Sequence, residues 1–233
     1  MIDREFIEKI EDMTGPKVIV TPQGAFSDKD LYRIENKLAD TIVLSSLSGL
    51  AEMIKQEMSE YNLPLFVRAT SAERVHVFGA IRDDMQRERP FTAEAKFIGF
   101  DFNEYISIEN MIICLKSRFA PTKDRDYLVQ LLGNITDQQS VQTKDDGITQ
   151  SATVKSGIQL IGEQRIKPIV TLKPYRTFLE VEQPESDFLI RLKDGRAALF
   201  EADGGAWERE AVKNVADKLR ELLEDVPNVH IIE

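Results

Sequence analysis

The sequence predicts an α+β fold with a mainly antiparallel sheet, an inserted helical hairpin and a long C-terminal helix. Two observations lead to this prediction. Runs in which apolar and polar residues alternate, as on half-buried strands, lie on both sides of two consecutive helical patterns in residues 107–132. Near the end of the chain, apolar residues recur at helical spacing from Val212 to Leu223. An antiparallel sheet packed against such helices belongs to the α+β class.

The N-terminal residues predict a helix, a short strand and a second helix. The first helix begins after Asp3 and ends at the Gly15-Pro16 pair, because both residues interrupt helices. A short strand follows at 17–21. Ser46 or Ser48 can accept hydrogen bonds from the first turn of the second helix. The apolar face of that helix consists of Leu47, Leu50, Ile54 and Met58.

The middle of the chain predicts the antiparallel sheet and the helical hairpin. Two apolar runs within 65–78 flank a polar turn, and a third alternating strand follows at 91–97. Ser107 and Thr122 each begin a helix, and the second of these helices ends before Gly133. The two helices therefore form a hairpin inserted between strands.

A change of composition after Gly133 places a domain boundary there. It separates an N-terminal α+β part, 1–133, from a β-rich part with the terminal helix, 134–233, and a single domain is the alternative. Asp146-Gly147 is the expected turn between two strands rich in Thr, Ser and Gln. Neither face of these strands is strongly apolar, so this arm either packs at the edge of the sheet or adds to another subunit. Further strands are expected at 166–172, 178–182, 188–192, 197–201 and 228–232.

The composition indicates a folded protein and argues against several functions. Of the 233 residues, 42% are hydrophobic, which is enough for a substantial core. The net charge is −10, which disfavours nonspecific nucleic-acid binding. No apolar run approaches the roughly 20 residues of a membrane span, and the acidic N-terminal residues are unlike a signal peptide. We therefore expect a cytoplasmic protein without membrane contact.

Residues suited to catalysis or metal binding are scarce. Cys114 is the single cysteine, so an internal disulfide is excluded, and His76 and His230 are the only histidines. We interpret both histidines as structural and Cys114 as a buried thiol. No phosphate-binding loop or nucleophile motif is present. We expect no cofactor, no metal and no catalytic residue.

Four segments carry a resemblance to a known family. They read PYRTFLEVEQPESDFLIRLKDG, ALFEADGGAWEREAVKNV, DDGITQSATVKSGI and LSSLSGLAEMI. These strings resemble an uncharacterised family of proteins encoded by tailed phages and prophages of Gram-positive bacteria, and the resemblance spans nearly the whole chain. It implies that the protein acts in a bacterial host cell, but it implies no activity and no site residue.

The first candidate ligand site lies between residues 175 and 191. Arg176 and Arg191 can grip a phosphate with paired hydrogen bonds, and Tyr175 offers an aromatic face for a base. Glu180 and Glu182 would share one face of a strand, where they could hold Mg²⁺ or act as acid and base. The alternative for both carboxylates is ion pairing with the arginines of neighbouring strands.

The second candidate site is the glycine pair before the last helix. Gly204 and Gly205 allow close approach of a ligand to the backbone, and the N–H groups of a first helical turn bind anions. A strand-to-helix turn that needs positive φ explains the same two glycines without a ligand.

Two functions remain after this reading. The first is a non-enzymatic phage binding protein, a homo-oligomer that sequesters a host protein or a small anionic, nucleotide-like signal and so counters host antiviral defence. The second is a metal-dependent enzyme or accessory factor in phage nucleic-acid metabolism that uses Glu180 and Glu182. A virion or assembly component is a further alternative.

Overall fold

The computed structural model of the chain divides into two compact units, Met1–Leu38 and Ala39–Glu233. The predicted boundary near residue 134 stays a prediction, and that residue lies within a helix. The turn Asp146-Gly147 and Met58 lie outside the described residues. The structure describes residues 3–22, 24–29, 38–57, 64–83, 85–136, 140–145, 150–156 and 159–233.

The first unit contains one helix and one β-hairpin. Helix α1 (Arg4–Met13) begins after Asp3, as the sequence predicts, and Thr14 follows it immediately before Gly15-Pro16. Strands β1 (Val18–Thr21) and β2 (Gly24–Ser27) pair antiparallel. The Lys29 ammonium group donates hydrogen bonds to three carbonyl oxygens at the end of α1, which connects the hairpin to the helix.

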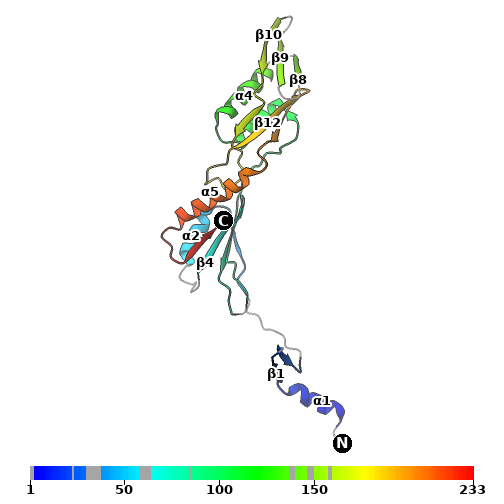
Figure 1. Cartoon of the computed structure of the whole chain (residues 1–233), viewed down its shortest axis with the longest axis vertical. Coiled ribbons are helices and arrows are strands. Elements are labelled where there is room, and N and C mark those ends of the chain that lie inside the picture. Colours follow the sequence, from blue (N-terminus) through cyan, green and yellow to red (C-terminus); the bar gives the residue numbers. More distant parts are fainter. Residues whose placement is uncertain are drawn as a thin grey trace. The chain divides into compact units, whose positions relative to one another are not determined.

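The second unit contains two lobes, and the first lobe is built on a five-stranded sheet. Its strand order is β14-β4-β5-β6-β3, with antiparallel pairs in the centre and a parallel pair at each edge. Figure 1 shows α2 and α5 lying against this sheet. The elements are β3 (Ile42–Leu44), α2 (Leu47–Glu57), β4 (Leu65–Ser71), β5 (Arg74–Gly79), β6 (Phe91–Glu94), α5 (Ala206–Leu222) and β14 (Val229–Ile232).

The alternation along the strands decides which face of this sheet the helices cover. On β4, Leu65, Val67 and Ala69 are buried while the residues between them are not. These buried residues form one core with the apolar faces of α2 and α5, including Val215 and Leu219 of the predicted C-terminal stripe. The opposite face of the sheet therefore carries the residues at the alternate positions.

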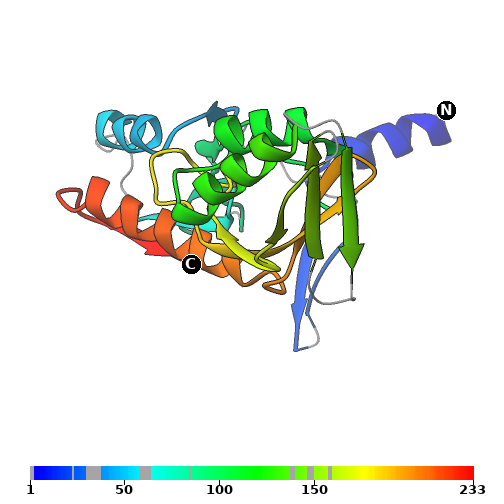
Figure 2. The same cartoon turned by 90° about the horizontal axis from the view of Figure 1, so that it is seen from above.

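The second lobe packs a helical hairpin against a four-stranded sheet of order β11-β12-β13-β7. Figure 2 shows the two green helices together on one side of the yellow and orange strands. The predicted caps are confirmed, because the Ser107 side chain accepts from the Asn110 N–H and the Thr122 side chain accepts from the Arg125 N–H. The elements are β7 (Ile106–Ser107), α3 (Ile108–Arg118), α4 (Lys123–Thr136), β11 (Ile169–Leu172), β12 (Ser186–Lys193) and β13 (Arg196–Glu201).

A separate three-stranded antiparallel sheet lies between α4 and β11 in the sequence. It consists of β8 (Ser140–Asp145), β9 (Gln150–Ser156) and β10 (Gln159–Arg165), in the order β10-β9-β8. The two predicted polar strands are confirmed as a pair, whereas β10 was not predicted.

The α+β class, the helical hairpin and the long C-terminal helix are confirmed, and three details of the prediction are wrong. The strand expected at 91–97 already ends at Glu94. Helix α4 does not end before Gly133 but continues through it to Thr136. The expected strand at 178–182 does not exist, because these residues form turns within the loop between β11 and β12. We refer to residues 173–185 as the connecting loop.

Candidate functional site

The Arg176 side chain, predicted to bind a ligand, is buried among protein groups. It is 6% exposed, and its guanidinium group forms an ion pair with Glu201 and donates to the Ser186 hydroxyl. Its central carbon lies 3.9 Å from the centroid of the Trp207 ring and 5.8 Å from that of Phe188. Protein side chains thus occupy most of the surface with which Arg176 could contact a ligand.

Nearby carboxylates compensate the positive charge of Arg176. Burial lowers the pKa of the guanidinium, while the carboxylates of Glu201, Asp203 and Glu208 act in the opposite direction. An incoming phosphate would have to approach these three carboxylates. We therefore interpret Arg176 as a structural residue that connects the sheet of the second lobe to the start of α5.

The carboxylate of Glu180 caps helix α2. It accepts hydrogen bonds from the backbone N–H groups of Leu47 and Ser48 at 2.6 and 2.9 Å, and also from the Ser48 hydroxyl. Ser46, one of the two predicted caps, accepts from the next N–H group, that of Gly49. Partial burial favours the neutral acid, but the hydrogen bonds from Ser48 and Leu47 lower the pKa of Glu180 below its ordinary value. The anion expected at a helix N-terminus is thus a residue of the same chain.

On a strand, Glu180 and Glu182 would project from the same face, but these residues do not form a strand. The Glu182 side chain is exposed and forms an ion pair with Lys173 at 2.7 Å. Glu185 lies 3.4 Å from the same ammonium group. This is ion pairing of the predicted kind, but with a lysine of the connecting loop in place of Arg176 or Arg191. The described residues contain no group of three or more His, Cys, Asp or Glu that could hold a metal ion.

Arg191 does not join Arg176 in a common site, and the backbone of Tyr175 is bound to the second lobe. The Tyr175 N–H donates to the carbonyl of Arg118, beside the contact between Phe119 and Pro174. On β12, Arg191 alternates with the buried residues, so it projects from the face opposite to Ser186, the residue that binds Arg176. The two arginines therefore cannot grip one phosphate.

Gly204 and Gly205 form the predicted turn at the start of α5. Their φ angles are +64° and +81°, a region that other residues rarely adopt. The Gly205 N–H donates to the Asp203 carboxylate at 3.1 Å, so the chain itself supplies a negative group at this helix end. The turn accounts for both glycines.

The connecting loop joins the two lobes. From it, the Thr177 hydroxyl donates to the Ala72 carbonyl at the β4–β5 turn, and Phe178 enters the core of the first lobe. Asn214 of α5 donates to the Glu182 carbonyl. The charged and aromatic residues that mark this segment in the sequence thus serve mainly to position α2, α5 and the second lobe relative to one another.

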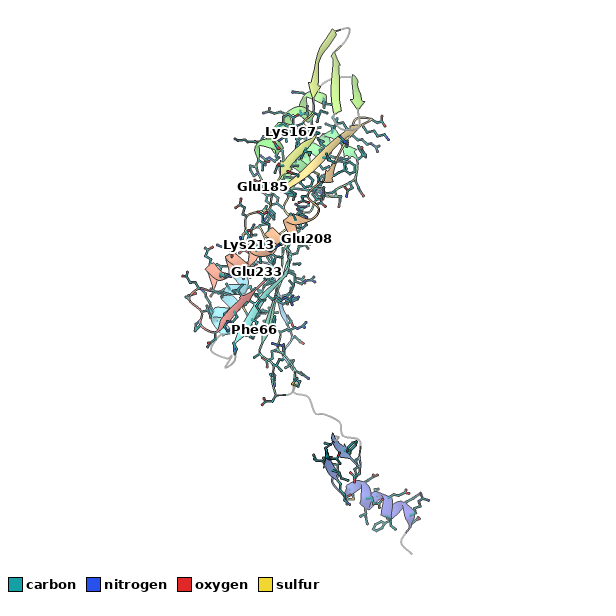
Figure 3. All side chains as sticks on the ribbon, viewed as in Figure 1. Phe66, Lys167, Glu185, Glu208, Lys213 and Glu233 are labelled. Carbon is teal, nitrogen blue, oxygen red and sulfur yellow. The ribbon has the colours of Figure 1, made fainter. Side chains whose placement is uncertain are left out.

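A row of aromatic side chains lies on the face of the five-stranded sheet that α2 and α5 leave uncovered. His230 pairs with Phe66, and Phe66 pairs with Phe78 on the next strand. Laterally paired residues project from the same face. The ring centroids are 5.4 Å apart for Phe66 and His230 and 5.7 Å apart for Phe66 and Phe78, and both pairs are stacked. Figure 3 labels Phe66 on this sheet.

A polar row follows next to the aromatic one. Arg68 pairs with His76, which in turn pairs with Thr92. The His76 Nδ1 atom lies 3.1 Å from the Thr92 hydroxyl oxygen, while Arg68 is exposed. We call the surface formed by His230, Phe66, Phe78, Arg68 and His76 the open face.

The open face is locally positive although the whole chain is acidic. The guanidinium carbon of Arg87 lies 5.5 Å from the centroid of the Phe78 ring. Partial burial, and then the charges of Arg89, Arg74 and Arg68, lower the pKa of His76 below its ordinary value, and Glu94 opposes them. Among the described residues, no carboxylate lies within ion-pair distance of Arg68 or Arg89, whereas Glu94 is paired with Arg74. The surface therefore combines stacked rings with unneutralised cations.

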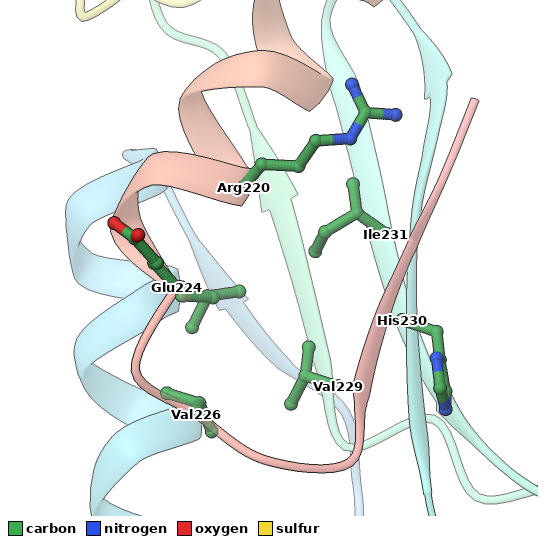
Figure 4. A pocket seen from close by; sticks show the side chains of 7 residues that line it. Arg220, Glu224, Val226, Val229, His230 and Ile231 are labelled. Carbon is green, nitrogen blue, oxygen red and sulfur yellow. The ribbon is translucent and has the colours of Figure 1, made fainter.

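A small pocket lies on the other side of β14. Its volume is about 360 Å³, and Arg220, Val226, Val229 and Ile231 are among the residues that line it. Figure 4 shows Val229 and Ile231 pointing toward the helix that bears Arg220, while His230 points away from it. His230 also borders this pocket, although its ring stacks on Phe66 of the aromatic row.

The open face was not predicted from the sequence, although a signal for it is present there. In 65–78 the outward positions of the two strands hold Phe66, Arg68, His76 and Phe78. An outward position of an ordinary two-layer sheet is usually polar, so two phenylalanines there mark either contact with another element or a binding surface.

Comparisons with known proteins give no family assignment. No protein-family model matches the chain, and no similar protein was found among curated proteins or among solved structures. Among the described residues, no helix combines the length and the apolar character that a membrane span requires.

Proposed function

We propose that the protein is a non-enzymatic binding protein whose ligand is anionic and carries a planar ring, as a nucleotide does. The observation that carries this proposal is the open face, where the stacked row of Phe66, Phe78 and His230 lies beside Arg68. Aromatic rings bind the faces of bases, and arginines bind phosphate. The nucleotide-like ligand inferred from the sequence is thus retained, but its site moves from Arg176 to the open face.

The charge distribution supports a small number of specific contacts. The net charge of −10 gives no overall attraction to a polyanion. Arg68 and Arg87, however, lie beside the aromatic row, and Arg89 acts on His76 of the polar row. Such a surface favours a ligand that stacks on the rings and presents a few phosphate groups to the arginines. It is less suited to a ligand that only long-range electrostatic attraction would hold.

The resemblance to proteins of tailed phages and prophages supports a role inside an infected bacterial cell. There, a protein that holds a nucleotide-like signal without turnover lowers its free concentration, which would counter an antiviral response that depends on that signal. We also propose a homo-oligomer. The apolar residues of α1, among them Phe6, Ile7 and Ile10, are exposed in the single chain, and a unit of this size lacks an adequate core.

Calorimetric titration tests the proposed ligand class. The panel comprises nucleoside mono-, di- and triphosphates and short single-stranded oligonucleotides. We expect at least one of them to bind and to be recovered chemically unchanged. Phe66→Leu should weaken that binding about tenfold, because it removes one stacking surface. Tyr105→Leu, at an exposed aromatic residue of the second lobe, is the matched control and should bind as the wild type does.

Three results would contradict the proposal. If no member of the panel binds, the open face is not a site for such ligands. If Phe66→Leu and Tyr105→Leu bind equally well, the ligand is held elsewhere. Turnover of the ligand would reject the non-enzymatic role.

A further inference from the structure

The open face is a sheet surface and not an enclosed pocket. Its residues project from adjacent paired strands, whereas the pocket described above lies behind β14. Sites for single small molecules are usually concave and bury most of the ligand. A lone nucleotide on a sheet surface is contacted from one side only, so it gains few contacts. A longer ligand gains the same contacts repeatedly.

The aromatic row is longer than one base requires. Its three rings come from three adjacent strands, with successive centroids 5.4 and 5.7 Å apart. A single base would leave part of the row in water. Consecutive unpaired bases of one strand can each stack on an aromatic side chain, as they do on other sheet surfaces that bind single strands.

Cations lie where the backbone of such a strand would pass. Arg87 lies over the Phe78 ring at one end of the row, and one nitrogen of its guanidinium group donates to the Gly79 carbonyl. Arg68 occupies the next row, between Ile232 and His76. Two positive groups at different positions along the aromatic surface match a chain of phosphates better than the clustered phosphates of one nucleotide.

A double helix does not fit the same surface. Its bases are paired and stacked on one another, so their faces cannot contact Phe66 or Phe78. Duplex binding relies on many phosphate contacts, which a chain with a net charge of −10 does not favour. This agrees with the expectation that the protein does not bind nucleic acid nonspecifically.

We propose that the open face binds a single strand of RNA or DNA, with two or more consecutive bases stacked on Phe66, Phe78 and His230. This inference rests on the proposed function, because it specifies the ligand of the same site. The strand crosses the sheet from β14 toward β5, and Arg68 and Arg87 contact its phosphates.

The test is a length series measured by fluorescence polarisation with the full chain. Oligo(dT) and oligo(U) of two, four and eight nucleotides carry a fluorescent label, and unlabelled mononucleotides and a duplex compete with them. We expect affinity to rise at least tenfold between the mononucleotide and the tetranucleotide, and the duplex not to compete. A preference between the two series distinguishes RNA from DNA.

Variants locate the strand on the open face. Phe78→Leu should weaken tetranucleotide binding about tenfold. Arg68→Ala should reduce the slope of log affinity against log salt by about 0.7, the value for one phosphate contact with a single strand. Arg209→Ala removes an exposed arginine of α5 and serves as the charge-matched control, for which we expect an unchanged slope.

The outcomes distinguish a failure of the strand from a failure of the nucleotide-like ligand. If a mononucleotide binds as tightly as the octanucleotide, the strand is rejected and the nucleotide-like ligand stands. If neither binds, both proposals fail. If oligonucleotides bind but the open-face variants match the control, the strand lies elsewhere on the protein and the assignment of the open face is wrong.

Discussion

The connecting loop and the open face contain similar residue types but use them in opposite ways. In the connecting loop, Arg176, Glu180 and Glu182 each have partners within the chain. On the open face, Arg68 projects to solvent beside stacked rings, with no carboxylate in ion-pair distance among the described residues. Density of charged and aromatic residues in a sequence therefore does not locate a binding surface. A better guide is whether the charge of a group already has a partner in the fold, as that of Arg176 does in Glu201, although its Nε atom is buried without a hydrogen bond.

The difference follows from where each region lies. The connecting loop lies between two cores, so its polar groups lose water and need partners within the chain. The open face is the solvent side of a two-layer lobe, where polar groups keep water as a partner. Its rings, however, keep apolar surface in water, a cost that a ligand stacked on them would relieve.

The variant expected to have the largest effect on stability is Arg176→Ala. It leaves Glu201 and Asp203 without their cation and opens space beside Trp207, so we expect a loss of about 3 kcal/mol in the free energy of unfolding. The sequence alone suggests a ligand-binding role for Arg176, whereas its burial indicates a structural one. Urea denaturation followed by Trp207 fluorescence measures the change. Wild-type stability together with lost nucleotide binding would restore Arg176 as a ligand residue.

A smaller loss is expected for Glu180→Gln, which removes the charge that caps α2. We expect the free energy of unfolding to fall by about 1–2 kcal/mol at pH 7. In the wild type, both carboxylate oxygens accept hydrogen bonds from the start of α2, whereas the amide of Gln has only one acceptor oxygen. The matched control is Glu182→Gln, two residues away, whose exposed carboxylate only pairs with Lys173. It should leave stability unchanged.

The same pair of variants has a pH signature. The pKa of Glu180 is lower in the folded chain than its ordinary value, so the stabilisation by its charge is complete above that ordinary value. It is lost as the pH falls through the folded pKa. Glu180→Gln should therefore flatten the acid limb of the stability profile, whereas Glu182→Gln should retain more of it. Parallel acid limbs for wild type and Glu180→Gln would show that the cap does not form.

A still smaller effect is expected at the start of α5. Gly205→Ala should cost about 1 kcal/mol, since φ is +81° and the space around an added Cβ is open, so only backbone strain opposes the change. Gly205→Asn should cost less, because asparagine tolerates this region. Thermal unfolding compares them. Equal losses for Ala and Asn would mean that something other than φ fixes this residue, such as a ligand at the backbone.

Local signals in the sequence predict most of the helices and strands. Ser107 and Thr122 cap their helices as expected, because an N-cap depends on residues only three positions away. The strand expected at 178–182 fails for the opposite reason. Phe178 enters the core of the first lobe and Glu180 caps a helix 133 positions earlier in the chain, so long-range contacts decide their conformation.

The candidate site was harder to predict because it depends on register. His230 reaches Phe66 only through the parallel pairing of β14 with β4, which joins segments at opposite ends of the second unit. No local pattern predicts that pairing, and His230 alone is most simply a structural histidine. The outward positions of Phe66 and Phe78 were visible in the alternation, but the uncovered face becomes evident only when both helices are placed on the other side.

A very small effect on stability is expected for Arg68→Ala on the open face, in contrast to Arg176→Ala in the connecting loop. Arg68 is exposed, and among the described residues no carboxylate lies close enough to pair with it, so the free energy of unfolding should change by less than about 0.5 kcal/mol. Urea denaturation of Arg68→Ala beside Arg176→Ala measures the contrast between the two arginines. A loss of stability close to that of Arg176→Ala would mean that Arg68 has a structural partner and is not available to a ligand. If the free energy of unfolding is unchanged, the charge of Arg68 stabilises nothing within the chain. The side chain is then free to bind phosphate.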